Sequence, residues 1–339
     1  MPLLEAGLLA TSVEEIAEAA RTMEALGFSG LVTAEAAHEP FLPLMVAAEH
    51  TQTLGLSTGI AVAFPRSPMI TASTAWDLQR YSGGRFILGL GTQVKGHNER
   101  RFSVPWDKPG PRMRDLILSI RAIWDCWQTG EPLNYQGDFY SFTLMTPFFD
   151  PGPHHHPRPP IYLAGVNPYI CRLAGELCDG FFVHPMHTCK YIETVVKPAL
   201  ADGAASSGRD SQDLKLVSSC FVACGDNEEE IENAIRAIKQ QISFYASTRT
   251  YKVILDVHGW GGLSDRLNGL SRQGRWNDMV DLIPDDMVAE MAVIGKRHEI
   301  GVLLSDKYEG VLDRISLYLP FLPGTDDDWW QGLAATLAS

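Results

Sequence analysis

The chain has 339 residues, of which 45% are hydrophobic and 20% are charged, and its formal net charge is -13. The apolar fraction is enough for a large core. The acidic balance excludes nucleic acid and anionic membranes as expected partners. No uncharged apolar run reaches the ~18 residues of a membrane span. The six cysteines form no CxxC pair, and the first residues lack the basic region of a secretory signal, which is typical of a cytoplasmic protein.

Strand-like and helix-like segments alternate from the beginning of the chain. Residues 3–10 form a short apolar strand pattern, and a helix is expected next, because Ser12 and Glu15 match a capping box. The next expected elements, in chain order, are a strand at 30–36, a helix at 43–54, a strand at 56–64, a helix at 68–81, a strand at 85–91 and a helix at 111–128. These strands are short and continuously apolar, as expected of strands covered on both faces.

Residues 129–159 break this alternation. They contain YQGDFYSFTL, which predicts a hairpin, and then PFFDPGPHHHPRPP, which is rich in Pro and Gly and predicts a surface excursion. The three histidines at 154–156 could bind a metal, but a proline-rich loop without acidic neighbours favours solvated side chains. We therefore expect no metal site.

The alternation returns after this excursion. The expected elements are strands at 160–165, 180–185, 214–224 and 299–305, helices ending at Cys178 and spanning 188–205, 227–245 and 309–318, and a mostly helical second excursion at 250–297. Eight strand–helix units in one chain predict an α/β fold, a closed (β/α)8 TIM-type barrel with insertions, and an open doubly wound sheet is the alternative. We expect a single domain over 1–339, with insertions at about 129–159 and 250–297.

In a barrel of this kind the active site lies at the carboxyl ends of the strands. The segments expected there, in chain order, are 35–38, 59–64, 91–101, 165–168 and 184–187. They contain an acid, Glu35, and several histidines, of which His38, His97 and His184 are candidates for chemistry near neutral pH. These segments therefore define where a ligand is sought.

The fourth strand ends in LGLG and is followed at once by polar residues. Gly89 and Gly91 would let a flat group lie close to the backbone. A group of basic side chains follows and could attract a phosphate or a carboxylate, although solvated charges at a helix start are the alternative. Its members are Lys95, Arg100, Arg101, Arg112 and Arg114.

Two further stretches indicate a ligand. In GVNP, Asn167 can cap a helix that begins at Pro168, so the free N–H groups of the first turn suit a phosphate; an ordinary capped helix is the alternative. In STGIAVAF, Gly59 weakens a buried strand, and a bulge or a close ligand approach is the usual reason.

Together these stretches resemble the bacterial luciferase-like superfamily, and most closely its branch that depends on the deazaflavin coenzyme F420. The resemblance spans nearly the whole chain and is carried by GFSGLVTAEAAHEPFLPL, TAWDLQRYSGGRFILGLGTQVKGHNERRF, PPIYLAG and RLAGELCDGFF. It implies a TIM-type barrel with insertions, F420 or FMN bound at the carboxyl ends of the strands, and a homodimer.

The resemblance also implies roles for individual residues. It predicts a cis peptide bond between Gly59 and Ile60 that supports the ring, and a phosphate-binding turn that begins at Gly165. The full set of residues to which it assigns cofactor binding is Gly59, Ile60, Ala61, Gly91, His97, Gly165, Val166, Asn167 and Tyr169.

The leading hypothesis is an F420-dependent oxidoreductase that transfers a hydride between the deazaflavin ring and a small organic substrate. Glu35, His38 and His97 are the candidate catalytic residues, because a nearby acid or histidine would carry the accompanying proton. Two departures from the family pattern bear on this hypothesis. Two alanines separate Glu35 from His38, which are adjacent in many relatives, and Val94 stands where some relatives carry a glutamate.

Three alternatives remain open. The same fold with FMN would be a luciferase-like monooxygenase, and a chain that had lost catalysis would be a flavin-binding or structural protein. Paired carboxylates at Glu35 and Asp179 would indicate a barrel hydrolase, although Asp179 is expected at the opposite end of the barrel. The two excursions are expected to shape the substrate pocket, where aromatic residues such as Phe148 and Trp276 could line it or simply pack.

Overall fold

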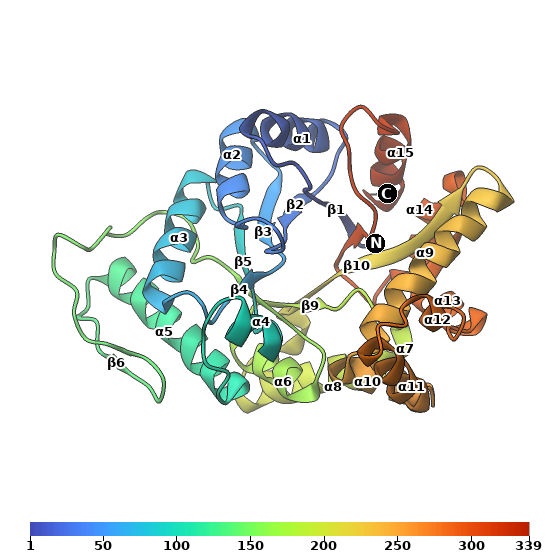
Figure 1. Ribbon diagram of the computed structural model, residues 1–339. Coiled ribbons are helices and arrows are strands. Elements are labelled where there is room, and N and C mark those ends of the chain that lie inside the picture. Colours follow the sequence, from blue (N-terminus) through green and yellow to red (C-terminus); the bar gives the residue numbers. More distant parts are fainter. Residues whose placement is uncertain (339) are drawn as a thin grey trace.

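The computed structural model describes residues 1–338 as a closed barrel of parallel strands surrounded by helices, which confirms the predicted fold class (Figure 1). Strand β1 (Leu3–Gly7) pairs with β2 (Gly30–Thr33) on one side and with β12 (Arg314–Leu317) on the other, so the sheet closes on itself. The other barrel strands are β3 (Gly55–Thr58), β4 (Ala61–Val62), β5 (Phe86–Gly91), β8 (Ile161–Gly165), β9 (Gly180–Val183) and β10 (Lys215–Gly225). All of these pairings are parallel, and β3 and β4 together form one wall of the barrel.

The helices cover the outside of the barrel. In chain order they are α1 (Val13–Ala25), α2 (Leu42–His50), α3 (Pro68–Tyr81), α4 (Lys95–Arg100), α5 (Pro109–Thr129), α6 (Pro168–Leu177), α7 (Cys189–Tyr191), α8 (Lys197–Ser206), α9 (Glu228–Ala246), α10 (Lys252–Asp256), α11 (Gly261–Arg272), α12 (Asn277–Val280), α13 (Asp285–Met291), α14 (Ile300–Tyr308) and α15 (Asp327–Ala338). Ser12 and Glu15 form the predicted capping box of α1. Within residues 1–338, every helix is too short or too polar to span a bilayer.

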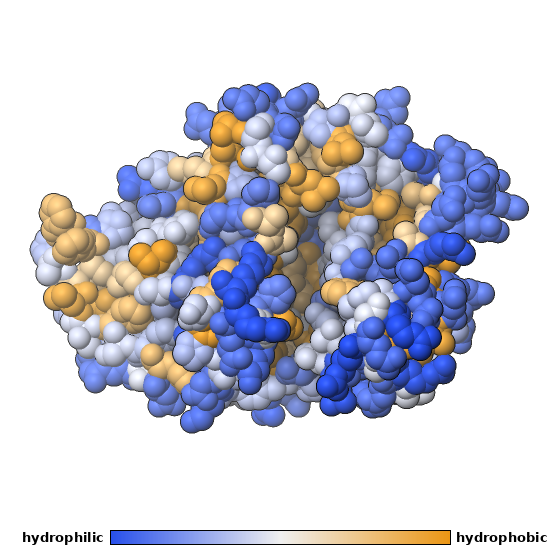
Figure 2. Space-filling view, in the orientation of Figure 1, coloured by the Kyte–Doolittle hydropathy of each residue, from blue (hydrophilic) through white to orange (hydrophobic). Residues whose placement is uncertain are grey.

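The two excursions lie on different sides of the barrel. The predicted hairpin is present as β6 (Tyr135–Gln136) and β7 (Ser141–Phe142), and its segment projects to the left in Figure 1, whereas α9 to α13 lie on the right. Phe148 is 90% exposed in the left-hand segment, where Figure 2 shows apolar atoms at the surface. Phe148 therefore does not line a pocket within the described chain.

The prediction for the last unit of the barrel is wrong. The apolar run expected as a strand at 299–305 is helix α14, and the expected helix at 309–318 contains the eighth strand, β12. Ile300, Leu304 and Tyr308 are buried at a spacing of four residues, which is helical, while Val302 between them is 56% exposed. A short apolar run fits either structure by pattern, and packing against β11 (Ala292–Lys296) and α15 decides it here.

A buried histidine ties together three elements beneath the carboxyl ends of the strands. The Nδ1 atom of His187 lies 3.0 Å from the backbone oxygen of His184 and 3.2 Å from the Ser218 hydroxyl on β10. Its Nε2 atom lies 3.1 Å from the Tyr308 hydroxyl on α14. Because a carbonyl oxygen only accepts, Nδ1 carries the proton of the neutral ring. This arrangement holds the turn that follows β9 in place.

The neutral state of His187 predicts a loss of stability in mild acid. A histidine titrates near ~6.5 in an unfolded chain, whereas burial lowers the pKa of His187 to about 4 in the fold. The neutral His187 ring therefore makes its full contribution to the unfolding free energy above about pH 6.5. This contribution is lost as the pH falls toward 4, and the loss reaches about 3 kcal/mol. The unfolding free energy of each protein is measured with urea at about pH 7.5 and at about pH 5. Between these two pH values, the unfolding free energy of wild type should fall by about 2 kcal/mol more than that of His187→Gln. Equal losses in the two proteins would contradict this account.

Candidate active site

A cavity of about 360 Å³ opens at the carboxyl ends of the barrel strands, where the barrel rule places an active site. Much of its wall is apolar, with Val32, Ile60, Phe182 and Val217 contributed by different parts of the barrel. Backbone and polar groups border it at the turn between β8 and α6 and at the turn after β9. The cavity therefore combines an apolar slot with a polar rim, which suits a planar cofactor or substrate.

A backbone bulge forms one side of this cavity. Strand β3 ends at Thr58 and β4 begins at Ala61, and the peptide bond between Gly59 and Ile60 is cis, as predicted. A Cβ atom on Gly59 would lie 2.5 Å from Val32 Cγ1, so a larger residue at this position would have to displace the Val32 side chain or the bulge. Both residues of the cis peptide line the cavity.

The glycines of LGLG accommodate this bulge. A Cβ atom on Gly89 would lie 1.7 Å from the carbonyl oxygen of Thr58, and one on Gly91 would lie 2.9 Å from the side chain of Ile60. The Thr58 hydroxyl also accepts from the Gly89 N–H at 2.9 Å and donates to its carbonyl at 2.8 Å. The sequence indicated a flat ligand close to these glycines, but at Gly89 the neighbour is the backbone of the protein itself. Gly91 does line the cavity.

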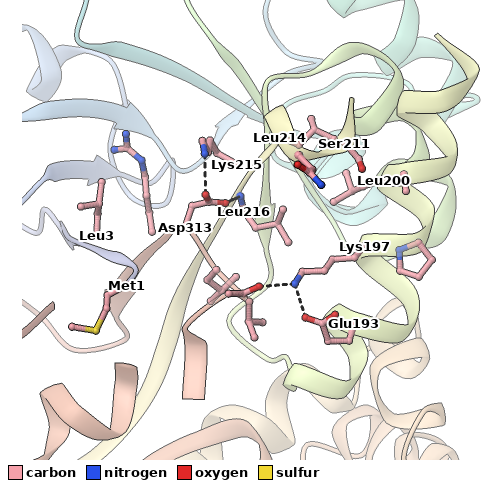
Figure 3. Close-up of a pocket in the computed structure, with 17 residues that line it drawn as sticks. Met1, Leu3, Glu193, Lys197, Leu200, Ser211, Leu214, Lys215, Leu216 and Asp313 are labelled. Atoms are coloured by element: carbon pink, nitrogen blue, oxygen red, sulfur yellow. Dashed lines mark hydrogen bonds and ion pairs between the residues drawn. The ribbon is translucent and has the colours of Figure 1, made fainter. Parts of the chain in front are cut away.

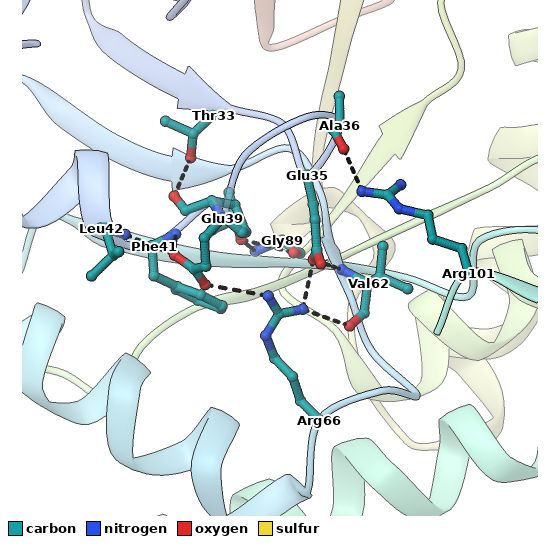
Figure 4. A network of polar contacts seen from close by, with 12 residues as sticks. Thr33, Glu35, Ala36, Glu39, Phe41, Leu42, Val62, Arg66, Gly89 and Arg101 are labelled. Carbon is teal, nitrogen blue, oxygen red and sulfur yellow. Dashed lines mark hydrogen bonds and ion pairs between the residues drawn. The ribbon is translucent and has the colours of Figure 1, made fainter. Parts of the chain in front are cut away.

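Glu35 supports the bulge from outside the cavity. Its Oε2 atom accepts from the Val62 N–H at 2.7 Å and from Arg66 Nη1 at 2.6 Å (Figure 4). Arg66 also donates to the Val62 carbonyl at 3.0 Å and lies 3.2 Å from a carboxylate oxygen of Glu39. The Glu35 side chain is 7% exposed and is not part of the cavity lining. This geometry favours a positioning role for Glu35 over contact with a substrate.

The two histidines predicted to be catalytic lie at the surface. His38 and His97 are both exposed, His38 in the loop after β2 and His97 in α4, and neither is part of the cavity lining. Their loops do meet, because Arg101 donates to the backbone oxygen of Ala36 (Figure 4). The catalytic role of these histidines stays a prediction.

His184 is the histidine that lines the cavity. Its Nδ1 atom accepts from the backbone N–H of Met186 at 3.1 Å, and burial lowers the pKa of its ring to about 3. The ring is therefore neutral near pH 7 and carries its proton on Nε2. Sequence reasoning placed His184 at the end of a strand, but the other ends carried histidines as well, and no pattern distinguished it.

The turn predicted to bind a phosphate connects β8 to α6. The Asn167 side chain accepts from the Ile170 N–H at 2.9 Å, so Asn167 caps α6, and Pro168 is the first residue of the helix, as predicted. Gly165, Val166 and Asn167 line the cavity. The ~4 N–H groups at the start of a helix lack partners within the helix and favour an anion.

Tyr169 and the basic side chains that follow β5 lie outside the cavity lining. Tyr169 is 49% exposed and packs over Gly110 of α5, where a Cβ atom would lie 2.3 Å from its ring. Arg114 forms a 2.7 Å ion pair with Glu176, and Arg112 donates to the Tyr140 hydroxyl at 3.0 Å. The expected basic group is therefore dispersed, and none of its members lines the cavity.

The sequence predicted solvated side chains for the histidine run in the first excursion, and this prediction is wrong for His154. His154 is 8% exposed, and its ring lies 3.9 Å from the ring of Trp76 on α3. Among the residues that the structure describes, neither ring nitrogen of His154 has a hydrogen-bond partner. Within residues 1–338, no group of three or more His, Cys, Asp or Glu side chains could hold a metal ion.

A second cavity, of about 940 Å³, lies at the other end of the barrel, where β10 and β12 begin (Figure 3). Its charged groups are already paired. Lys197 lies 2.5 Å from Glu193, and Lys215 lies 3.1 Å from Asp313. This cavity therefore presents neutralised charges at the end of the barrel that chiefly contributes stability.

Comparison with known proteins identifies the family. The model of the luciferase-like monooxygenase family matches residues 3–314. An uncharacterized protein of Mycobacterium tuberculosis H37Rv is 45% identical over 309 residues, which cover 91% of each chain. The 5,10-methylenetetrahydromethanopterin reductase of Archaeoglobus fulgidus is 26% identical over 262 residues, covering 76% of this chain and 74% of the relative.

A solved structure agrees with this result at the level of the fold. The coenzyme F420-dependent tetrahydromethanopterin reductase of Methanopyrus kandleri superimposes with a TM-score of 0.77 at 18% identity, covering 99% of this chain and 98% of the other. The fold, the carboxyl-end cavity and the family match are consistent with one another. The chain belongs to the luciferase-like monooxygenase family, a family of oxidoreductases.

Proposed function

We propose that this protein is an oxidoreductase that uses F420 to transfer a hydride to or from a small organic substrate. The observation that carries the proposal is the cavity at the carboxyl ends of the strands, with the bulge between β3 and β4 on one side and the capped start of α6 on its rim. The likeness in sequence to a methylenetetrahydromethanopterin reductase, and in fold to an F420-dependent reductase, supports it.

The residues around the cavity fit such a cofactor. Ile60 and Phe182 offer apolar surface to a planar ring, and the turn at Gly165 to Asn167 offers backbone N–H groups to a phosphate. When bound, F420 supplies a carbon centre that donates or accepts a hydride. The chain would hold that ring against the substrate and exclude water. We further propose a single barrel domain with insertions at 129–159 and 250–297, which acts as a cytoplasmic homodimer.

FMN is the second candidate, and with it the protein would be a monooxygenase. Two observations favour this alternative. The family to which the chain belongs is described as luciferase-like monooxygenase. In addition, the dispersal of Arg112 and Arg114 removes the basic group that would have favoured the longer, acidic tail of F420.

Titration of the purified protein with each cofactor distinguishes the two candidates. We expect F420 to bind and FMN to bind at least about tenfold more weakly, a difference of about 1.4 kcal/mol. The quenching of cofactor fluorescence measures both affinities under the same conditions. Tight binding of FMN without any response to F420 would make the monooxygenase the better conclusion.

The phosphate turn provides a second prediction. A Cβ atom on Gly165 would lie 2.4 Å from Ile170 Cγ2, so Gly165→Ala should displace the first turn of α6. We expect F420 binding to weaken about tenfold or more, and binding of the ribityl deazaflavin that lacks the phosphate and the rest of the tail to change about twofold at most. Gly7→Ala is the matched control, because no atom lies within 4 Å of the added Cβ at the end of β1. Equal losses for both ligands would argue against phosphate binding at this turn.

Glu35 provides a third prediction, which separates positioning from catalysis. Glu35→Gln keeps an oxygen acceptor for the Val62 N–H, whereas Glu35→Ala removes it and leaves Arg66 without its nearest carboxylate. We expect the Ala variant to lose about 1–3 kcal/mol in unfolding free energy and to bind F420 more weakly. The Gln variant should keep F420 affinity and kcat within about threefold of wild type, because its amide oxygen can still accept from the Val62 N–H and hold the bulge. A drop of about a hundredfold or more in kcat alone for Glu35→Gln would assign the carboxyl a catalytic role.

A further inference from the structure

Ring side chains from four elements form one wall beside the cavity. His184 follows β9, Tyr245 lies in α9, Tyr251 ends the short helical turn at Arg249–Tyr251, and Tyr318 follows β12. The His184 ring lies 4.3 Å from the Tyr251 ring and 4.6 Å from the Tyr245 ring, and the Tyr245 and Tyr318 hydroxyls are 2.8 Å apart. His184 and Tyr251 line the cavity directly. The second excursion thus contributes a ring to the site.

The backbone holds His184 in one orientation and one tautomer. The Met186 N–H donates to its Nδ1 atom, and its own carbonyl oxygen accepts from the buried His187 ring. The remaining ring nitrogen, Nε2, must then carry the proton. Within residues 1–338, no protein atom accepts a hydrogen bond from it. A fixed donor in a half-buried cavity wall is therefore available to a ligand.

The charge of the cavity narrows the choice of ligand. In the described chain, the lining contains no lysine and no arginine, and its one carboxylate is Glu5. Glu5 is 3% exposed and is paired with Arg314 at 2.9 Å. Apart from the turn at Gly165 to Asn167, which the proposed function assigns to the cofactor phosphate, the lining supplies no positive charge to balance a substrate anion. The preferred partner of Nε2–H is therefore an uncharged acceptor oxygen.

We propose that His184 is the substrate-binding residue of this site, donating a hydrogen bond from Nε2 to a carbonyl oxygen of an uncharged, planar substrate whose flat part packs against Tyr251. The inference rests on the proposed function, because it describes the substrate of that same cavity. The aromatic ring of Tyr251 supplies the apolar surface, and the His184 donor supplies the orientation. His187, Ser218 and Tyr308 act as positioning residues for this donor.

The test uses acetophenone as the probe and ethylbenzene, which lacks the carbonyl oxygen, as its matched control. His184→Phe keeps a ring and removes the donor, whereas His184→Gln keeps an N–H donor. We expect His184→Phe to weaken acetophenone binding about tenfold and to leave ethylbenzene binding within about twofold, while His184→Gln retains most of the affinity for acetophenone. Calorimetric titration of the full chain, with and without F420, measures each affinity.

A spectroscopic measurement tests the same donor without any turnover. In protein with ¹⁵N-labelled histidine at about pH 7, we expect the His184 ring as the Nε2–H tautomer, with acetophenone shifting the Nε2 signal more than the Nδ1 signal. An Nδ1–H tautomer would overturn the inference. So would equal loss of both probes in His184→Phe, unchanged binding of acetophenone in that variant, or failure of wild type to bind acetophenone.

The outcomes separate this inference from the proposed function. If wild type binds F420 but His184→Phe still binds acetophenone as well as wild type does, the cofactor proposal stands and the substrate inference is wrong. If acetophenone binding depends on His184 while F420 does not bind, the substrate inference stands and the cofactor proposal is wrong. Ethylbenzene binding within about twofold of wild type in His184→Phe is the check that this variant keeps the fold of the site, and it applies whether or not F420 binds.

Discussion

The close approach of two strands, β3 and β5, shapes the mouth of this barrel. The carbonyl oxygen of Thr58 occupies the space that a Cβ atom on Gly89 would need, at 1.7 Å. Only a glycine permits this contact, and the Thr58 hydroxyl then pairs with both backbone groups of Gly89. The bulge at Gly59 and Ile60 directly follows Thr58 in the chain. Both residues of the bulge line the cavity.

Several polar side chains near the mouth hold backbone in place. Glu35 and Arg66 hold the start of β4, and Asn167 caps α6. His187 holds the turn after β9 by contacts with β10 and α14. Because these groups satisfy one another, the cavity itself keeps few charges. In the role proposed for His184, its Nε2–H is a fixed donor in the cavity wall that a neutral substrate can meet.

Much of the site follows from sequence position, because the end of a parallel strand in a barrel must lie at the common mouth. The segments at Gly59, Gly91 and Gly165 were placed in this way, and all three line the cavity. The direction of each side chain did not follow in the same manner. His38 and His184 both come after strands, yet the loop after β2 leaves His38 exposed, while contacts of the backbone with Met186 and His187 turn His184 inward.

The sequence by itself determined the alternating strand–helix units and the capped helices, and it indicated a bulge or a close ligand approach at Gly59, because period, caps and missing side chains are local properties. Tertiary structure alone decided the last unit, where the apolar run at 299–305 became α14 through packing against neighbours that lie far away in the chain. It also decided which histidine reaches the cavity. A side chain's neighbours across the barrel are set by closure of the sheet, and no short stretch of sequence contains that information.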